Sequence, residues 1–227
     1  MIYIYGNSFT CPPDAHKHDN LKNTWPSIVA RCLKTQLCNY GLGGSCFAHT
    51  FRQIKNNHKK WTDKDTVIIS QSSVRRKLFF NDLPNTTKLQ DLLDSKRFGF
   101  SQDQKEFLYK FCYPYFHNDT LSIEELTAYY NLINDWLIEK NVYCYVLHCF
   151  NPEEEIFENF SNITFSFGKQ LYYISDHEFK IPRHINDDRV GHFTEKNHKL
   201  IAKQVLKAII DKSPVDLSGN FVKGVLN

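Results

Sequence analysis

The first residue in the chain whose type and setting could support covalent chemistry is Ser8. It follows a short apolar run, residues 1–5, and a glycine, Gly6. A serine hydroxyl becomes an effective nucleophile only when a base removes its proton. An apolar run that ends at a glycine predicts a buried strand opening into a loop, and such a loop would expose Ser8. Taken alone, a serine in this position is more often a turn or helix-capping residue.

Two histidines near the other end of the chain are candidate bases for this serine. His192 and His198 are six residues apart, which is not the i, i+4 spacing of a zinc-binding helix. Thr194 predicts the start of a helix, so His192 falls in the loop before it and His198 falls inside it. A loop histidine can approach Ser8, whereas a helical one is more often a packing or capping residue. We therefore favour His192 as the base.

Four short motifs accompany these residues in a fixed order. They are residues 6–10 (GNSFT), 24–30 (TWPSIVA), 39–45 (NYGLGGS) and 191–194 (GHFT). Their order and spacing resemble the SGNH, or GDSL-like, hydrolase superfamily over roughly residues 1–76 and 186–210. The resemblance implies a flavodoxin-like three-layer α/β/α fold with a central parallel sheet. It also implies a serine esterase without metal or cofactor.

The resemblance assigns roles to individual residues. Ser8 matches the nucleophile of the family's first block, and His192 matches the base of its last block. Gly44 matches the second-block glycine, whose backbone N–H helps to form the oxyanion hole. The hole would then consist of the N–H groups of Ser8 and Gly44, with one side-chain donor from the third block.

This sequence departs from the family pattern in its first and third blocks. Asn7 stands where the family has an aspartate before the nucleophile. The third block reads Ser-Gln-Ser-Ser at residues 70–73 and has no asparagine, so Ser72 is the candidate side-chain donor. Arg76 resembles a variant of this block in which an arginine follows a Ser/Thr pair. Losing one donor of an oxyanion hole costs about 10²–10³ in rate.

The acid that supports the histidine is also displaced. The family spacing falls on Arg189, while Asp188 and Asp187 lie four and five residues before His192. Such an acid fixes the imidazole tautomer and stabilises the imidazolium. One extra loop residue would let either aspartate reach the ring, and we favour Asp188.

The elements that must position these residues alternate along the chain. Predicted strands cover residues 1–5, 36–40, 66–69, 142–149 and 171–174, and predicted helices begin at Thr24 and cover residues 45–60, 123–139 and 196–210. This alternation predicts an α/β fold, a parallel sheet with helices on both faces. Functional residues of such sheets gather at the carboxyl ends of the strands. Ser8, Gly44 and Ser72 each follow a predicted strand, so we expect them to converge.

Length and composition indicate one domain over residues 1–210, with an aromatic-rich insertion at about 77–120 and a C-terminal extension at 211–227. A net charge of +3 and the lack of a long basic run argue against a nucleic-acid partner. No apolar stretch is long enough to span a membrane, and the first residues do not resemble a secretory signal. We therefore expect a cytoplasmic or otherwise unsecreted protein. Seven cysteines without a CxxC pair give no support for a zinc site.

The resemblance therefore implies hydrolysis of a small-molecule or carbohydrate ester through an acyl-enzyme on Ser8. Two alternatives stay open: a non-catalytic binding or structural protein with this fold, and an O-acyltransferase that uses the same site. A nucleotide-binding protein is disfavoured, because residues 41–46 (GLGGSC) lack the third glycine of a dinucleotide fingerprint and the lysine of a phosphate loop.

Overall fold

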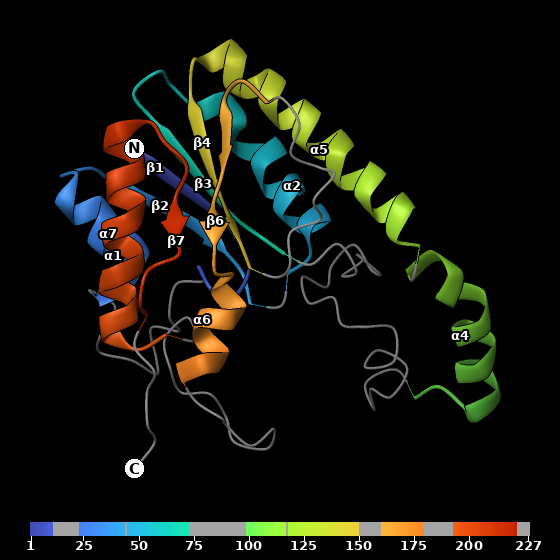
Figure 1. Cartoon of the computed structure of the whole chain (residues 1–227). Coiled ribbons are helices and arrows are strands. Elements are labelled where there is room, and N and C mark those ends of the chain that lie inside the picture. Colours follow the sequence, from blue (N-terminus) through green and yellow to red (C-terminus); the bar gives the residue numbers. More distant parts are fainter. Residues whose placement is uncertain are drawn as a thin grey trace.

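The central feature of the fold is one parallel sheet. The computed structural model describes residues 1–10, 23–43, 45–72, 99–116, 118–149, 160–178 and 193–221. Its main sheet consists of β1 (Ile2–Gly6), β2 (Leu37–Gly41), β3 (Thr66–Gln71), β4 (Tyr143–His148) and β5 (Ile163–Phe165). The strands lie in the order β2-β1-β3-β4-β5, and every neighbouring pair is parallel (Figure 1). This order is that of flavodoxin-like sheets, so the predicted α/β fold is confirmed.

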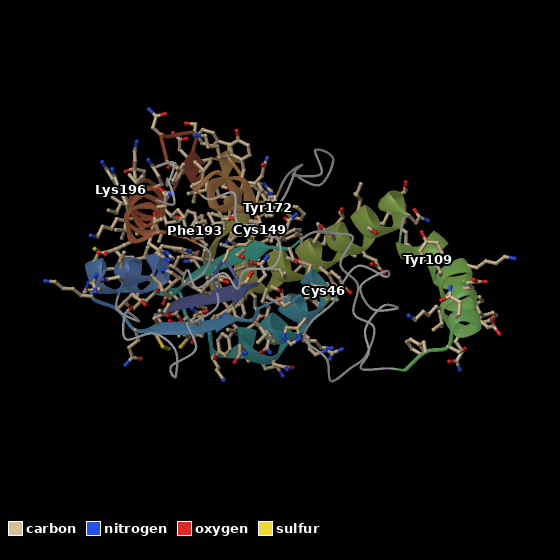
Figure 2. The ribbon with its side chains drawn as sticks, turned by 90° about the horizontal axis from the view of Figure 1, so that it is seen from below. Cys46, Tyr109, Cys149, Tyr172, Phe193 and Lys196 are labelled. Carbon is tan, nitrogen blue, oxygen red and sulfur yellow. The ribbon has the colours of Figure 1, made fainter. Side chains whose placement is uncertain are left out.

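Helices cover both faces of this sheet (Figure 1). One face carries α1 (Trp25–Cys32), α6 (Leu171–Glu178) and α7 (Glu195–Asp211). The other face carries α2 (Phe47–Asn57), which continues into a 3₁₀ turn (His58–Lys60), and α5 (Asp119–Lys140). A further helix, α4 (Gln102–Phe116), extends away from the sheet, where Tyr109 marks it in Figure 2.

The side chains of β1 show why it lies inside the sheet. Ile2 and Ile4 pack in the core beneath α1 and α7, while Tyr3 and Tyr5 pack in the core beneath α2 and α5. All four are essentially inaccessible to solvent. A strand that buries both faces reads as a continuous apolar run, which is the pattern that predicted it.

The prediction of a strand at residues 171–174 is wrong, because this segment begins α6. Leu171 and Ile174 are buried at the i, i+3 spacing of a helix, while Tyr172 and Tyr173 between them are about half exposed. A short apolar run does not by itself distinguish a strand from a helix. The fifth strand is instead β5, which has three residues and gave no sequence signal.

The start of the predicted C-terminal extension packs against the domain. β7 (Asp216–Leu217) pairs with β6 (Phe167–Gly168) in a second, two-stranded sheet. Val215 and Leu217 are completely buried in the core next to α7. Residues 215–217 therefore contribute to the core of the domain.

Parts of the predicted insertion and of the candidate site fall outside the described residues. Of the insertion at about 77–120, the structure describes residues 99–116 and 118–120, which include α4. Among all the described residues, no helix is both long and apolar enough to cross a membrane.

Candidate active site

The candidate site lies where the chain leaves the adjacent strands β1 and β3. In a sheet of this order the connections diverge from these two strands, and the resulting crevice at their carboxyl ends is the usual ligand site. Ser8 is half-buried two residues beyond β1, and Ser72 is buried directly after β3. Both serines therefore lie at the carboxyl edge of the sheet, as expected.

Gly6 ends β1 in a conformation that other residues rarely adopt. Its φ is +143°, and a Cβ at this position would lie 2.6–2.8 Å from the O, Oγ and Cβ atoms of Ser70. Only glycine allows the end of β1 to approach β3 so closely. The turn that carries Ser8 therefore begins at a residue whose position is fixed by close packing against Ser70.

Asn7 fastens this turn to the rest of the edge. It is completely buried, and its Oδ1 accepts hydrogen bonds from Phe9 N at 3.1 Å, Ser70 Oγ at 2.9 Å and Cys149 Sγ at 3.6 Å. Because a backbone N–H is one of these donors, the amide oxygen must face this way. Asn7 thus connects the loop of Ser8 to the ends of β3 and β4.

The backbone of Asn7 also closes the turn. Its carbonyl oxygen accepts from the N–H of Thr10 at 3.1 Å and from the hydroxyl of Thr10 at 3.0 Å. The Thr10 carbonyl in turn accepts from Asn39 Nδ2 at 2.7 Å. Ser8 therefore sits within a loop that is held from both sides.

The loop after β2 is tied to the same strand ends. Gly6 O accepts from Leu42 N at 2.9 Å and from Ser45 Oγ at 2.8 Å. Ser45 O accepts from Ser72 Oγ at 2.8 Å. Both serines are buried, so these bonds are shielded from water.

The bond to Ser45 bears directly on the role predicted for Ser72. A serine hydroxyl has a single proton to donate, and that of Ser72 goes to the Ser45 carbonyl. While this bond persists, the side chain has no proton for an oxyanion. Direct donation by Ser72 stays a prediction that requires its hydroxyl to change partner.

His198, the histidine predicted to lie inside a helix, accepts a hydrogen bond at the start of α1. Its Nδ1 accepts the Trp25 backbone N–H at 3.1 Å, so this nitrogen is the cap acceptor of α1. Thr24 occupies the N-cap position but its side chain makes no capping hydrogen bond and pairs with Ser27 Oγ at 3.0 Å. The prediction that the helical histidine is a capping or packing residue is confirmed.

Aromatic contacts join the start of α7 to the loop of Ser8. The rings of Phe9 and Phe193 lie 5.6 Å apart, and Phe193 makes an edge contact with His198 at 5.4 Å. Trp25 Nε1 donates to Phe9 O at 3.1 Å. Phe193 and Cys149 belong to the same core cluster, and both are labelled in Figure 2. The residues that flank Ser8 and His192 in sequence are therefore in contact.

The remaining predicted site residues lie outside the described part of the chain. These are Gly44, Arg76, Asp187, Asp188, Arg189 and His192. The structure brings together the ends of β1 and β3 with their serines, and it leaves the positions of the predicted base, acid and second-block glycine as predictions.

Sequence reasoning missed His148, a buried histidine at the last position of β4. His148 pairs with Gln71 of β3 in the sheet, and its backbone N–H donates to Ser166 Oγ at 3.1 Å. Its ring stacks on that of Phe165, with the ring centroids 5.8 Å apart. Burial lowers the pKa of His148 to about 4, so its imidazole is neutral at pH 7. A polar residue at the end of an otherwise apolar run was the signal that could have identified it.

No group of metal-ligating side chains occurs among the described residues.

No family model and no curated protein matches this chain. Among solved structures, the chain is similar to a protein from Desulfitobacterium hafniense described as lipolytic and of the G-D-S-L family. The TM-score is 0.45 and the identity 9%, over 91% of this chain and 97% of that chain. The likeness concerns architecture at most, so the chemistry of this chain must be inferred from its own residues.

Proposed function

We propose that this protein is a serine-dependent acyl-ester hydrolase that works through an acyl-enzyme on Ser8. The observation that supports it most is the contact between Phe9 and Phe193, whose rings lie 5.6 Å apart. Ser8 precedes the first of these residues and His192 precedes the second. This contact supports the proposal because it joins the residues that follow the nucleophile and the predicted base in the sequence.

In the proposed reaction His192 accepts the proton of Ser8 as the serine oxygen attacks the ester carbonyl. The tetrahedral intermediate collapses when the alcohol leaves with the proton from His192. Water then attacks the acyl-enzyme, again giving its proton to His192, and the acid is released as Ser8 recovers its proton. Asp188 orients the imidazole and stabilises its charged form.

The oxyanion of both intermediates would be held by the backbone N–H groups of Ser8 and Gly44. Preorganised donors are effective because they need no rearrangement when the negative charge develops. The hydrogen bonds of Asn7 support this proposal, since they hold the turn of Ser8 against two strand ends. A nucleophile on a well-supported turn is what such a mechanism requires.

The proposed substrate is a small-molecule or carbohydrate ester, with an O-acetyl sugar as the first candidate. This choice of substrate class rests on analogy with the family alone. Transfer of the acyl group to a second alcohol would use the same residues, with that alcohol replacing water. No step of this mechanism needs a metal or a cofactor.

Hydrolysis of p-nitrophenyl acetate and release of acetate from acetylated sugars test the proposal. Wild type should turn over at least one of these esters, and Ser8→Ala should not. Ser101→Ala is the matched control, because Ser101 is an exposed serine at the start of a helix far from this edge. Adding an alcohol acceptor distinguishes transfer from hydrolysis by the product formed. Equal rates for wild type and Ser8→Ala would contradict the proposal and favour a non-catalytic binding protein.

A further inference from the structure

The loop after β2 contains two consecutive glycines, Gly43 and Gly44. A Cβ added at Gly43 would meet no atom of the described residues within 4 Å, so within the described part of the chain no packing fixes this part of the loop. Glycine also gives the backbone the greatest conformational freedom. A loop of this kind keeps a fixed course only if hydrogen bonds on either side of the glycines hold it.

Both ends of the glycine pair carry such bonds. On one side, Leu42 N donates to Gly6 O at 2.9 Å. On the other side, Ser45 is completely buried; its hydroxyl donates to the same Gly6 carbonyl at 2.8 Å, and its N–H donates to Leu42 O at 3.2 Å. The loop is thus attached to the end of β1, two residues before Ser8.

Ser72 supplies the attachment to β3. Its hydroxyl donates to Ser45 O at 2.8 Å, and its side chain is 1% exposed. Ser45 is therefore held through its side chain by β1 and through its carbonyl by β3. Ser45 directly follows Gly44 in the sequence, so it is the described residue next to the predicted oxyanion-hole glycine.

From these bonds we infer that Ser72 is a positioning residue: it holds the loop after β2 in place through Ser45 and does not itself contact the oxyanion. The inference rests on the proposed function for its catalytic consequence. It differs from the role that the family pattern suggests, in which the third block supplies a side-chain donor. Ser72 and Ser45 then act as one unit, because both hold the same loop.

A double-mutant cycle on hydrolysis distinguishes the two roles. Ser72→Ala and Ser45→Ala should each lower kcat about 10- to 100-fold and change KM less than about twofold, because a small misplacement of a catalytic group affects the transition state most. The double variant should be no slower than about threefold below the slower single variant, because neighbours that act together are not additive. Independent effects that multiply would show that Ser72 acts on its own and would overturn the inference.

Ser122→Ala is the matched control. Ser122 is also buried, at 2% exposure, and its hydroxyl donates to a backbone carbonyl, that of Asn118, at 2.8 Å. It lies in the first turn of α5 and its hydroxyl bonds within that helix end and not to the loop after β2, so the kcat of Ser122→Ala should equal that of wild type. If Ser72→Ala does not fold, Ser72→Cys replaces the hydroxyl by a slightly larger side chain with only a weak donor and should lose part of the activity. A folded Ser72→Cys with unchanged kcat would contradict the inference.

Hydrogen exchange separates failure of this inference from failure of the proposed function. In Ser72→Ala, the amides of residues 42–45 should exchange at least about tenfold faster than in wild type, and those in Ser122→Ala should not. This readout does not depend on activity. If wild type hydrolyses nothing but the exchange increases, the proposed function fails and the anchoring role stands. Unchanged exchange would overturn the anchoring role itself.

Discussion

The ring of Phe193 contacts the ring of Phe9 at 5.6 Å, although the two residues come from opposite ends of the chain. The contact belongs to a group in which His198 accepts the Trp25 N–H and Trp25 Nε1 donates to Phe9 O. Together these interactions attach the start of α7 and the start of α1 to the loop of Ser8. Any motion of Phe193 relative to this loop must disturb a buried aromatic cluster.

His198 should matter for stability and not as a base. His198→Ala leaves the Trp25 N–H without an acceptor and should lower the free energy of unfolding by about 1–3 kcal/mol. His198→Asn keeps an acceptor near the position of Nδ1 and should lose less. Urea unfolding measures both variants, and ester hydrolysis by folded His198→Asn should stay within a few fold of wild type. A folded but inactive His198→Asn would instead identify His198 as the base.

Gly6 should tolerate no side chain. Gly6→Ala combines a φ of +143° with a Cβ less than 3 Å from three Ser70 atoms, so we expect a loss of at least about 2 kcal/mol in stability. Gly43→Ala is the control, since a Cβ there meets no atom within 4 Å in the part of the chain that the structure describes, and it should change stability by less than about 1 kcal/mol. Thermal unfolding of both variants gives the answer, and a stable Gly6→Ala would refute the tight approach of β1 and β3.

Asn7 should be needed for its oxygen. Asn7→Ala removes the acceptor for Phe9 N and Ser70 Oγ, and each buried donor left without a partner costs about 1–3 kcal/mol. Asn7→Asp keeps an acceptor for the same donors, and hydrogen bonds to a carboxylate favour its charged form. It also removes Asn7 Nδ2, a buried donor that has no partner among the described residues. We expect Asn7→Asp to be clearly more stable than Asn7→Ala in urea unfolding; equal losses would argue against this role of the oxygen.

His148 should make stability depend on pH. Burial lowers its pKa to about 4 in the folded protein, against about 6.5 when unfolded, so the unfolded chain binds the extra proton between these values. The contribution of neutral His148 to the free energy of unfolding is therefore fully present above pH 6.5. It decreases as the pH falls towards 4, by up to about 3 kcal/mol. Urea unfolding at pH 7 and pH 5 should show a larger loss for wild type than for His148→Gln. The same loss in both proteins would mean that His148 does not titrate in this range.

The elements that the sequence predicted best are those whose pattern depends on burial alone. β1, β3 and β4 are continuous apolar runs because both of their faces are covered, and parallel order then brings Ser8 and Ser72 to one edge. β5 has three residues, too few for a period to show. The sequence at the start of α6 fits a strand as well as a helix, and only the buried and exposed positions in the structure distinguish the two.

The hydrogen bonds of the site could not be predicted in the same way. The bond from Cys149 to Asn7 joins residues 142 positions apart, and the bond from Ser72 to Ser45 depends on the course of the loop after β2. Such pairs follow from the directions of side chains after packing, which residue types and spacing do not fix. For this reason Asn7 was predicted only as a replacement for an aspartate, and Ser72 only as a possible donor.

The central claim is that Ser8 is an activated nucleophile with His192 as its base. The most direct measurement is labelling with a fluorophosphonate probe, read by intact mass, on wild type, Ser8→Ala, His192→Ala and Ser101→Ala. We predict one adduct on wild type and on Ser101→Ala, none on Ser8→Ala, and labelling slowed at least about 100-fold in His192→Ala. No adduct on folded wild type, or an adduct that persists in Ser8→Ala, would contradict the account.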